Sequence, residues 1–238
     1  MQLSKRLLAA AGLVTKGNRV ADIGCDHAYT SIYLCKEGIA PSVIAMDVRK
    51  GPLLCAKQNV ELYGLTKQIS LRLSDGLKAL SAGEVETLLL TGMGGLLILK
   101  ILSEFPEVAA SAKELILQPQ SEAAQVRRFL HKSGYKITTE RIVKEDEKFY
   151  VLMRAVRADV PQQYEHECDY RYGRELVTED KEVFFEFLAR EKRLREEVLA
   201  KISAQETKRT KERKQELEHE LLIIEAAAFA YRQRKEQK

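Results

Sequence analysis

The sequence predicts an α/β protein with a mostly parallel sheet, an antiparallel final hairpin and a C-terminal α-helical antiparallel coiled coil. Short apolar runs alternate with helical stretches over residues 19–134, and two strand-like segments, 135–143 and 148–156, then follow one another directly. After Tyr164, apolar residues recur mostly at steps of three, four and seven. Alternating strands and helices are typical of parallel sheets with right-handed crossovers, and heptad steps are typical of helices that pack along a seam.

Five strands are expected in the parallel part, each followed by a helix or a turn. The predicted strands are residues 19–24, 42–47, 69–75, 85–92 and 114–119. The predicted helices are residues 28–38, 52–64, 94–105 and 121–134, and Pro52 suits the first turn of its helix. The apolar residues near the start of the chain share one helical face, which favours a packing helix over a signal peptide.

The predicted tail begins after Pro161, so we expect a compact domain over 1–160 and a helical coiled-coil domain over 161–238. Two helices that fold back on each other explain the pattern, with the charged run 208–214 near the tip; one long helix is the alternative. The first predicted seam is Leu176, Val183, Phe187, Leu194, Val198 and Ile202, and the second is Leu217, Leu221, Ile224, Ala228 and Tyr231.

Composition excludes several classes of protein. The four cysteines show no C-x-x-C spacing and no accompanying histidine cluster, so we expect neither a metal site nor a disulfide framework. No apolar run is long enough to span a membrane, and we expect a cytoplasmic protein. The net charge is +4, and the first 162 residues carry 22 basic against 17 acidic side chains. This moderately basic part allows an anionic partner.

The loop after the first predicted strand carries the strongest functional signal. It comprises residues 22–28 and contains Asp22, Gly24 and Asp26. A dinucleotide fingerprint needs glycines where this chain has Asp26 and Tyr29, and carboxylates would repel a pyrophosphate. A cationic ligand suits the loop better, and S-adenosylmethionine carries a sulfonium and an ammonium group. A plain strand-to-helix turn capped by an aspartate is the alternative.

Three further signals stand at the carboxyl ends of predicted strands, where ligands bind in open α/β sheets. Asp47 is expected to bind ribose hydroxyls. Asp75-Gly76 is expected at an adenine amino group, with a simple turn as the alternative. Residues 91–95, Thr-Gly-Met-Gly-Gly, are expected to form the floor of a transfer site. They lack the Asn/Asp-Pro-Pro-aromatic motif with which many enzymes methylate exocyclic base nitrogens, so the predicted target is another atom.

The segments DIGCDHAY, AMD, SDG, TGMGG and LQPQ together resemble the bacterial tRNA adenine-22 N1-methyltransferase family. The resemblance extends over essentially the whole chain. It implies a class I, Rossmann-like methyltransferase domain with a C-terminal coiled coil, S-adenosylmethionine as the methyl donor and tRNA as the substrate. The cofactor-binding residues expected from these motifs are Asp22, Gly24, Cys25, Asp26, Asp47, Asp75, Gly76, Gly92 and Gly94.

Catalysis at adenine N1 needs mainly positioning and exclusion of water, because an unpaired N1 carries no proton. We expect Met93 and the Gly92 and Gly94 backbone to hold the base, with Tyr29 or His27 stacking on it or hydrogen-bonding to it. Alternatively, Tyr29 packs within its helix and His27 caps a turn.

Basic side chains are expected to anchor tRNA phosphates. A solvated charged surface is the alternative for those in the tail. The candidates are Lys5, Arg6, Arg127, Arg128 and Lys132 in the first domain and Lys208, Arg209, Lys211, Arg213 and Lys214 in the tail.

Rival interpretations share the same fold. One is a methyltransferase acting on another RNA, a protein or a small molecule. Another is a non-catalytic adaptor that acts through its coiled coil, although a vestigial pocket need not keep its acidic residues. A nicotinamide oxidoreductase is disfavoured by the first loop. A monomer is expected rather than a dimer.

Overall fold

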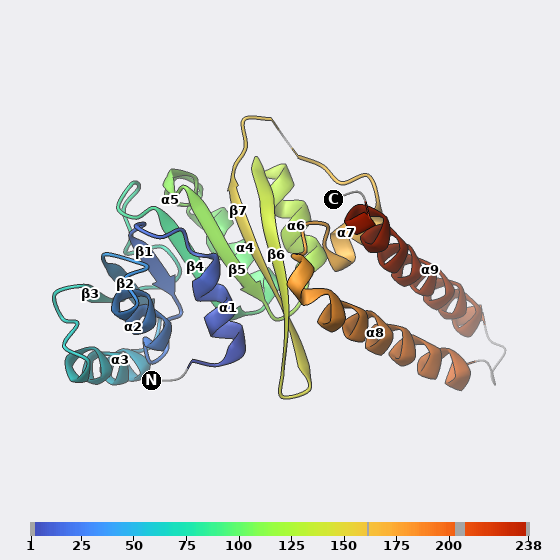
Figure 1. The fold of residues 1–238 in the computed structure, drawn as a ribbon, viewed down its shortest axis with the longest axis horizontal. Helices are drawn as coiled ribbons and strands as arrows, with labels where there is room; N and C mark the ends of the chain where they lie inside the picture. The colour runs from blue at the N-terminus through green and yellow to red at the C-terminus, as the bar shows by residue number, and fades with distance from the viewer. Residues whose placement is uncertain (1–2, 161, 203–207, 237–238) are drawn as a thin grey trace. The chain divides into compact units, whose positions relative to one another are not determined.

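The computed structural model describes residues 3–160, 162–202 and 208–236. The chain divides into two compact units, Met1–Gln163 and Tyr164–Lys238. The first unit contains the sheet, and the described elements of the second are helices (Figure 1).

The first unit is built on a seven-stranded sheet of order β3-β2-β1-β4-β5-β7-β6. Strands β1 to β5 are mutually parallel, and β7 pairs antiparallel with both β5 and β6. The predicted parallel sheet with an antiparallel final hairpin is therefore confirmed. The strands are β1 (Val20–Ile23), β2 (Val43–Asp47), β3 (Ile69–Leu73), β4 (Thr87–Met93), β5 (Glu114–Pro119), β6 (Tyr135–Glu145) and β7 (Lys148–Arg157).

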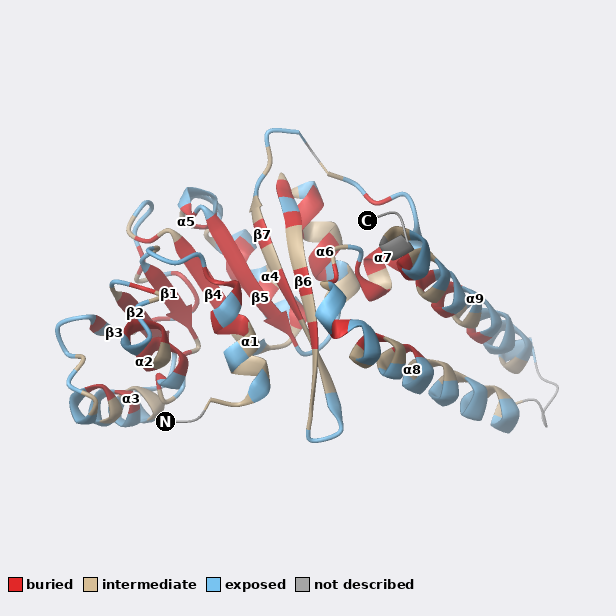
Figure 2. Cartoon of the chain, in the orientation of Figure 1, coloured by how far each residue is buried: buried red, intermediate tan, exposed pale blue. Residues whose placement is uncertain are grey.

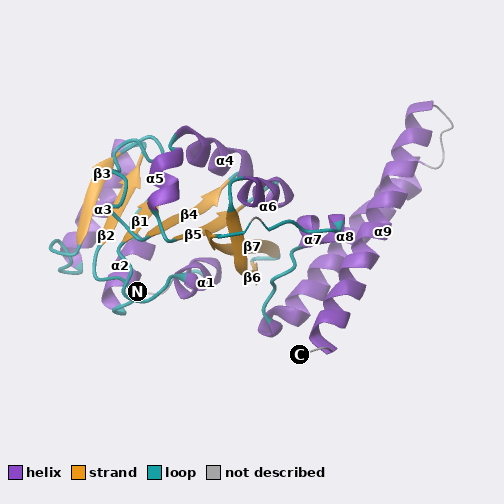
Figure 3. Ribbon diagram, turned by 90° about the horizontal axis from the view of Figure 1, so that it is seen from above, coloured by secondary structure: helices purple, strands orange, loops and turns teal. Residues whose placement is uncertain are grey.

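Helices cover both faces of this sheet (Figures 1 and 3). On one face lie α1 (Lys5–Leu13), α2 (Tyr29–Lys36) and α3 (Lys50–Leu62), and on the other α4 (Gly95–Glu104), α5 (Pro106–Ser111) and α6 (Ala123–Lys132). All residues of β1, β2 and β5 are buried (Figure 2), which explains why these strands appear as continuous apolar runs.

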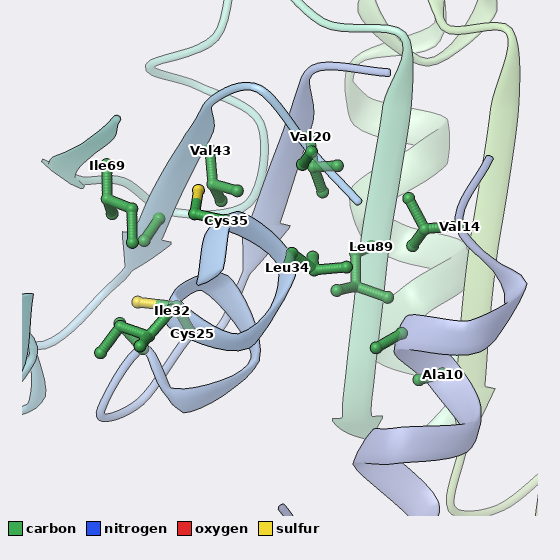
Figure 4. Close-up of a cluster of buried hydrophobic side chains, with 14 of the residues drawn as sticks. Ala10, Val14, Val20, Cys25, Ile32, Leu34, Cys35, Val43, Ile69 and Leu89 are labelled. Carbon is green, nitrogen blue, oxygen red and sulfur yellow. The ribbon is translucent and has the colours of Figure 1, made fainter. Parts of the chain in front are cut away.

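The core under the first face joins α1 and α2 to the centre of the sheet (Figure 4). Ala10 of α1 and Leu34 of α2 are fully buried there, together with Val20 and Leu89 of adjacent strands. This packing holds α1 against α2 and against strands that come later in the sequence.

Two local features differ from the predictions. Helix α5 is not predicted, because only Pro106 at its first position signals it in a stretch of six residues. The β6–β7 hairpin turns on two residues, Asp146 and Glu147, with φ of +47° and +58°. A two-residue turn with positive φ at both positions matches the twist of paired strands, so β6 extends two residues further toward the turn than predicted, whereas β7 begins at Lys148 as predicted.

The second unit is a helical hairpin with α7 (Glu167–Tyr172) packed on α9. A short 3₁₀ turn over Thr178–Asp180 precedes α8 (Lys181–Ile202), and α9 spans Lys208–Glu236. The ring centroids of Phe184 and Tyr231 are 5.0 Å apart, and Arg195 lies 2.7 Å from Glu220. The start of α8 therefore faces the end of α9, and the two helices are antiparallel.

The seam predicted for α8 is displaced by one residue. Helix α8 buries Phe184 and Leu188, whereas Leu194 and Val198 of the predicted seam are 39% and 40% exposed. Arg195 occupies the inward position beside Leu194, because its aliphatic stem packs while its guanidinium binds carboxylates on both helices. In α9 the predicted seam residues Leu217, Ile224 and Tyr231 are buried.

No helix within residues 3–160, 162–202 and 208–236 is long and apolar enough to cross a membrane.

Candidate functional site

A cleft of about 480 Å³ lies where the strand order reverses between β1 and β4. In open α/β sheets this reversal separates the strand-end loops and makes room for a ligand. All but Gly94 of the twelve residues predicted for cofactor binding and catalysis line it. The lining residues from that set are Asp22, Gly24, Cys25, Asp26, His27, Tyr29, Asp47, Asp75, Gly76, Gly92 and Met93.

The first loop crosses toward β2 in a left-handed conformation. The backbone N–H groups of Gly24 and Cys25 both donate to the carbonyl of Met46, over 2.8 and 2.9 Å. Gly24 has a φ of +73°, and a Cβ at this position would lie 2.4 Å from Met93 Cε. Glycine is therefore needed both for the turn and for the close approach of Met93.

The loop is not held by a capping aspartate, which was the alternative interpretation. Helix α2 begins at Tyr29 and no side chain caps it. The Asp26 backbone N–H instead donates to Asp47 Oδ2 over 3.3 Å. Asp26 itself is exposed on the wall of the cleft, with its Oδ2 at 3.6 Å from His27 Nε2.

Asp22 is a buried carboxylate at the base of the cleft. It is 2% exposed and accepts a hydrogen bond from the Ser31 hydroxyl over 2.7 Å. Burial raises the pKa of Asp22 to about 6; the Ser31 hydrogen bond opposes this shift, and the negative charge of Asp47 adds to it. A cation in the cleft would favour the ionised form.

The Cys25 side chain belongs to the core and not to the chemistry of the cleft. Its thiol is buried in the cluster beneath α2 (Figure 4), and burial raises the pKa of Cys25 above its ordinary value. A protonated, buried thiol is a poor nucleophile, so no chemical step is assigned to Cys25.

Asp47 closes β2 and organises the next part of the wall. Its Oδ1 accepts from the backbone N–H of Arg49 over 2.9 Å, and its side chain is buried.

Asp75 is exposed at the edge of the cleft beside Gly76, whose φ is +56°. Ile101 of α4 lies within 3.2 Å of a Cβ built on Gly76, so an apolar side chain faces this end.

The three glycines at the junction of β4 and α4 have different roles. Gly92, with a φ of +74°, sits at a register irregularity in β4 and lines the cleft. Gly94 is the N-cap of α4 and is not among the residues that line the cleft, so its role in cofactor binding stays a prediction. A Cβ on Gly95 would lie 2.5 Å from the Ser121 carbonyl oxygen, so Gly95 is required for packing.

His27 and Tyr29 form a pair on the wall beside the first loop. Their ring centroids are 5.9 Å apart, and Tyr29 is 42% exposed. This exposure disagrees with the alternative that Tyr29 packs inside its helix. Both rings are available to a flat ligand.

Sequence reasoning missed several lining residues. Arg6 and Leu7 come from α1, and Gln120 follows β5. Arg6 was predicted as a surface phosphate anchor, yet its side chain lines the cleft and is 27% exposed. Gln120 ends the LQPQ segment, but no motif places Arg6 or Leu7 in the cleft, because α1 reaches it only through tertiary packing.

The remaining basic candidates fall into different environments. Arg127 is fully buried and its Nε lies 2.7 Å from Glu140 Oε1, so its predicted contact with tRNA phosphates is wrong. The pair forms because α6 packs directly on β6.

The other basic candidates lie at the surface or near it. Lys5 is exposed on α1 and Arg128 is half-buried. In the tail, Lys208, Arg209 and Lys211 are exposed, and Arg213 pairs with Glu216 and Glu220.

The donor set fits S-adenosylmethionine. Asp22, Asp26 and Asp47 surround one end of the cleft with carboxylates, which suits an ammonium group, a sulfonium group and ribose hydroxyls. The apolar side chains of Val48 and Ile101 and the exposed Asp75 also line the cleft, a combination that suits an adenine ring and its amino group. The same carboxylates would oppose a pyrophosphate.

A family model described as "TrmK: tRNA (adenine(22)-N(1))-methyltransferase" matches residues 20–226. The chain belongs to this family. A relative in the TrmK family, the tRNA (adenine(22)-N(1))-methyltransferase of Bacillus subtilis (strain 168), is 33% identical over 228 residues, 94% of this chain and 96% of the relative.

Solved structures of similar proteins share the fold. A putative tRNA (m1A22) methyltransferase of Streptococcus pneumoniae, solved in complex with S-adenosyl-L-methionine, is 33% identical with a TM-score of 0.85, covering 95% of this chain and 100% of that chain. The B. subtilis TrmK structure is 32% identical with a TM-score of 0.79, covering 95% and 99%. The predicted Rossmann-like fold is confirmed by these likenesses and by the sheet topology.

Proposed function

We propose that this chain transfers the methyl group of S-adenosylmethionine to N1 of adenine 22 in tRNA, giving 1-methyladenosine. The observation that carries the proposal is the acidic cleft at the β1–β4 switch point in a chain of the TrmK family. S-adenosylmethionine supplies an electrophilic methyl group when bound. The chain supplies binding, orientation and exclusion of water.

Each carboxylate of the cleft is proposed to bind a different group of the cofactor. Asp22 and Asp26 attract the ammonium group, and Gly24 lets the backbone approach the methionine portion. Asp47 accepts hydrogen bonds from the ribose hydroxyls, and Asp75 accepts one from the adenine amino group. Cys25, Gly76 and Gly92 contribute backbone surface.

The acceptor base enters on the side of Met93. Unpaired adenine presents a lone pair at N1 and no proton there, so the residues around it need only position the ring. The Gly92 backbone and Met93 hold the base from the β4 side, and Tyr29 or His27 contacts its face. This arrangement requires no general base.

The base must leave its place in folded tRNA before transfer, which costs unstacking energy that phosphate contacts repay. Lys5 and Arg128 in the first unit and Lys208, Arg209, Lys211 and Arg213 in the second are the surface residues proposed for this anchoring. The enzyme is proposed to act in the cytoplasm as a monomer.

The test is incubation with labelled S-adenosylmethionine and unmodified tRNA, followed by nucleoside analysis. We expect 1-methyladenosine with wild-type tRNA and none with a tRNA that has guanine at position 22. Methylation of the guanine variant, or no 1-methyladenosine in either tRNA, would overturn the proposal. A chain that binds S-adenosylhomocysteine but methylates no tRNA would favour the adaptor or small-molecule alternatives.

A further inference from the structure

The cleft has two chemically different halves. The loops after β1, β2 and β3 bring Asp22, Asp26, Asp47 and Asp75 to one half. The half beneath β4 and β5 is lined by Thr91, Gly92, Met93 and Gln120, together with Arg6 from α1. Among the described residues that line this second half there is no carboxylate, so it suits an anionic or acceptor-rich ligand.

Gln118 fixes the geometry of this second half. It lies in the LQPQ segment at the end of β5, is fully buried, and does not line the cleft. Its Oε1 accepts from the backbone N–H of Gly92 over 3.0 Å and from Arg6 Nη1 over 3.3 Å. Because both partners are donors, the amide oxygen must face them, and the orientation of Gln118 is determined.

The fold keeps this amide although its other end is unsatisfied. Within the part of the chain that the structure describes, Gln118 Nε2 is buried without a hydrogen-bond partner. A buried unpaired donor is destabilising, and an apolar side chain of similar shape would avoid that cost. The value of Gln118 therefore lies in its oxygen, which aligns Gly92 with Arg6.

Arg6 is held from three sides at the rim of the cleft. Besides the contact with Gln118, its guanidinium lies 5.5 Å from the Tyr150 ring centroid, and its Nε is 3.8 Å from Glu145 Oε2. A guanidinium offers five N–H donors, and the hydrogen bond to Gln118 uses one. An arginine ordered before its ligand arrives loses less entropy on binding.

We propose that Arg6, positioned by Gln118, binds the phosphodiester of the target nucleotide as its base enters the β4–β5 half of the cleft. This inference rests on the proposed function, since it requires an RNA substrate. The phosphate is a better partner than the base, because methylation at N1 makes the ring cationic and a neighbouring guanidinium would oppose that charge. The planar fork of arginine matches two phosphate oxygens.

The first experiment compares Arg6→Gln and Arg6→Lys with Lys113→Gln. Lys113 is the matched control, because it is exposed just before β5, at the amino ends of the parallel strands, whereas the cleft lies at their carboxyl ends. Arg6→Gln is expected to raise KM for tRNA by roughly 10-fold to 100-fold, the usual effect of losing a charge-assisted hydrogen bond. The Kd for S-adenosylhomocysteine should change less than about twofold, because Arg6 stands outside the acidic half.

Salt dependence separates a phosphate contact from a base contact. The slope of log kcat/KM for tRNA against log salt should fall by about 0.7 in Arg6→Gln, the value for one lost phosphate contact on a single strand. Arg6→Lys should keep the wild-type slope but not the wild-type KM, because lysine keeps the charge without the fork. Lys113→Gln should match wild type in KM and slope.

A double-mutant cycle tests the positioning role. Gln118→Met removes the acceptor of both Arg6 and Gly92 and roughly keeps the shape, so it should raise KM for tRNA more in the wild-type background than in Arg6→Gln, where only the loss of the Gly92 hydrogen bond remains. Binding of S-adenosylhomocysteine reports whether each variant is folded, and the Arg6 variants alone decide the phosphate contact if Gln118→Met does not fold.

An unchanged salt slope in Arg6→Gln, or equal losses of tRNA and S-adenosylhomocysteine affinity, would overturn the phosphate contact. Fully additive effects of the two substitutions would show that Gln118 does not position Arg6. If the wild-type enzyme forms no 1-methyladenosine, the proposed function itself fails, and this outcome is distinguishable because it precedes any variant.

Discussion

The buried carboxylate of Asp22 should make cofactor binding depend on pH. Its pKa of about 6 means that the group is neutral below pH 6 and ionised above it. The ionised fraction is about 0.9 at pH 7 and about 0.1 at pH 5, so affinity for S-adenosylhomocysteine, which carries the same ammonium group, should fall about tenfold from pH 7 to pH 5. In Asp22→Asn the contribution of this group to the pH dependence should disappear.

The raised pKa of Asp22 also predicts how the stability of the cofactor-free protein changes with pH. Because burial raises the pKa of Asp22 from 3.8 to about 6, the group favours the folded, cofactor-free chain most below pH 3.8 and loses that contribution as the pH rises through 6. The shift corresponds to about 3 kcal/mol at neutral pH. Asp22→Asn should therefore stabilise the cofactor-free protein at pH 7 by up to about 3 kcal/mol while weakening cofactor binding.

The assays are titration calorimetry with S-adenosylhomocysteine from pH 5 to pH 8 and urea unfolding of the cofactor-free protein at pH 7. His27→Gln is the control, because an imidazole lines the same cleft. The reasoning is refuted if wild-type affinity is flat over this range, if Asp22→Asn keeps the full slope, or if Asp22→Asn is less stable than wild type at pH 7.

Three further predictions follow from the geometry. Gly24→Ala should weaken S-adenosylhomocysteine binding at least tenfold by calorimetry, because the new Cβ meets Met93 Cε in a strained φ region; wild-type affinity would contradict this. Glu140→Ala should cost about 3–5 kcal/mol in urea unfolding by leaving the Arg127 guanidinium buried without its carboxylate, and a loss below about 1 kcal/mol would contradict the buried pair. Tyr29→Ala should lower kcat/KM for tRNA about tenfold with little change in cofactor affinity, and normal activity would remove Tyr29 from the site.

The architecture of the first unit could be predicted because its signals are local. Strands covered on both faces appear as uninterrupted apolar runs, and the loops after them collect the glycines and carboxylates. Parallel strands end at one edge of the sheet, so Asp22, Asp47 and Asp75 had to meet once the strands were assigned. The acidity of the first loop also directed the prediction away from a pyrophosphate ligand.

Residue type and position did not reveal how each basic side chain is used. Arg127 and Arg128 are neighbours in the sequence, yet Arg127 is fully buried beside the carboxylate of Glu140 and Arg128 is half-buried. A charged side chain in a helix is normally solvated, and its burial depends on a partner that another element supplies. Likewise, the choice between Leu194 and Arg195 along α8 depends on carboxylates of α9 as well as on apolar periodicity.

The sequence by itself therefore determined the sheet, its final hairpin, the helical tail and the acidic half of the cleft, since the signals for each are local: apolar runs, heptad steps and the loops that follow the strands. Only the tertiary structure brought Arg6 and Gln118 together beside the predicted Gly92 in the other half. Arg6 and Gln118 are 112 positions apart, and no periodicity or motif links them. They meet because α1 packs against the sheet beside β5, and long-range packing of this kind depends on the whole core.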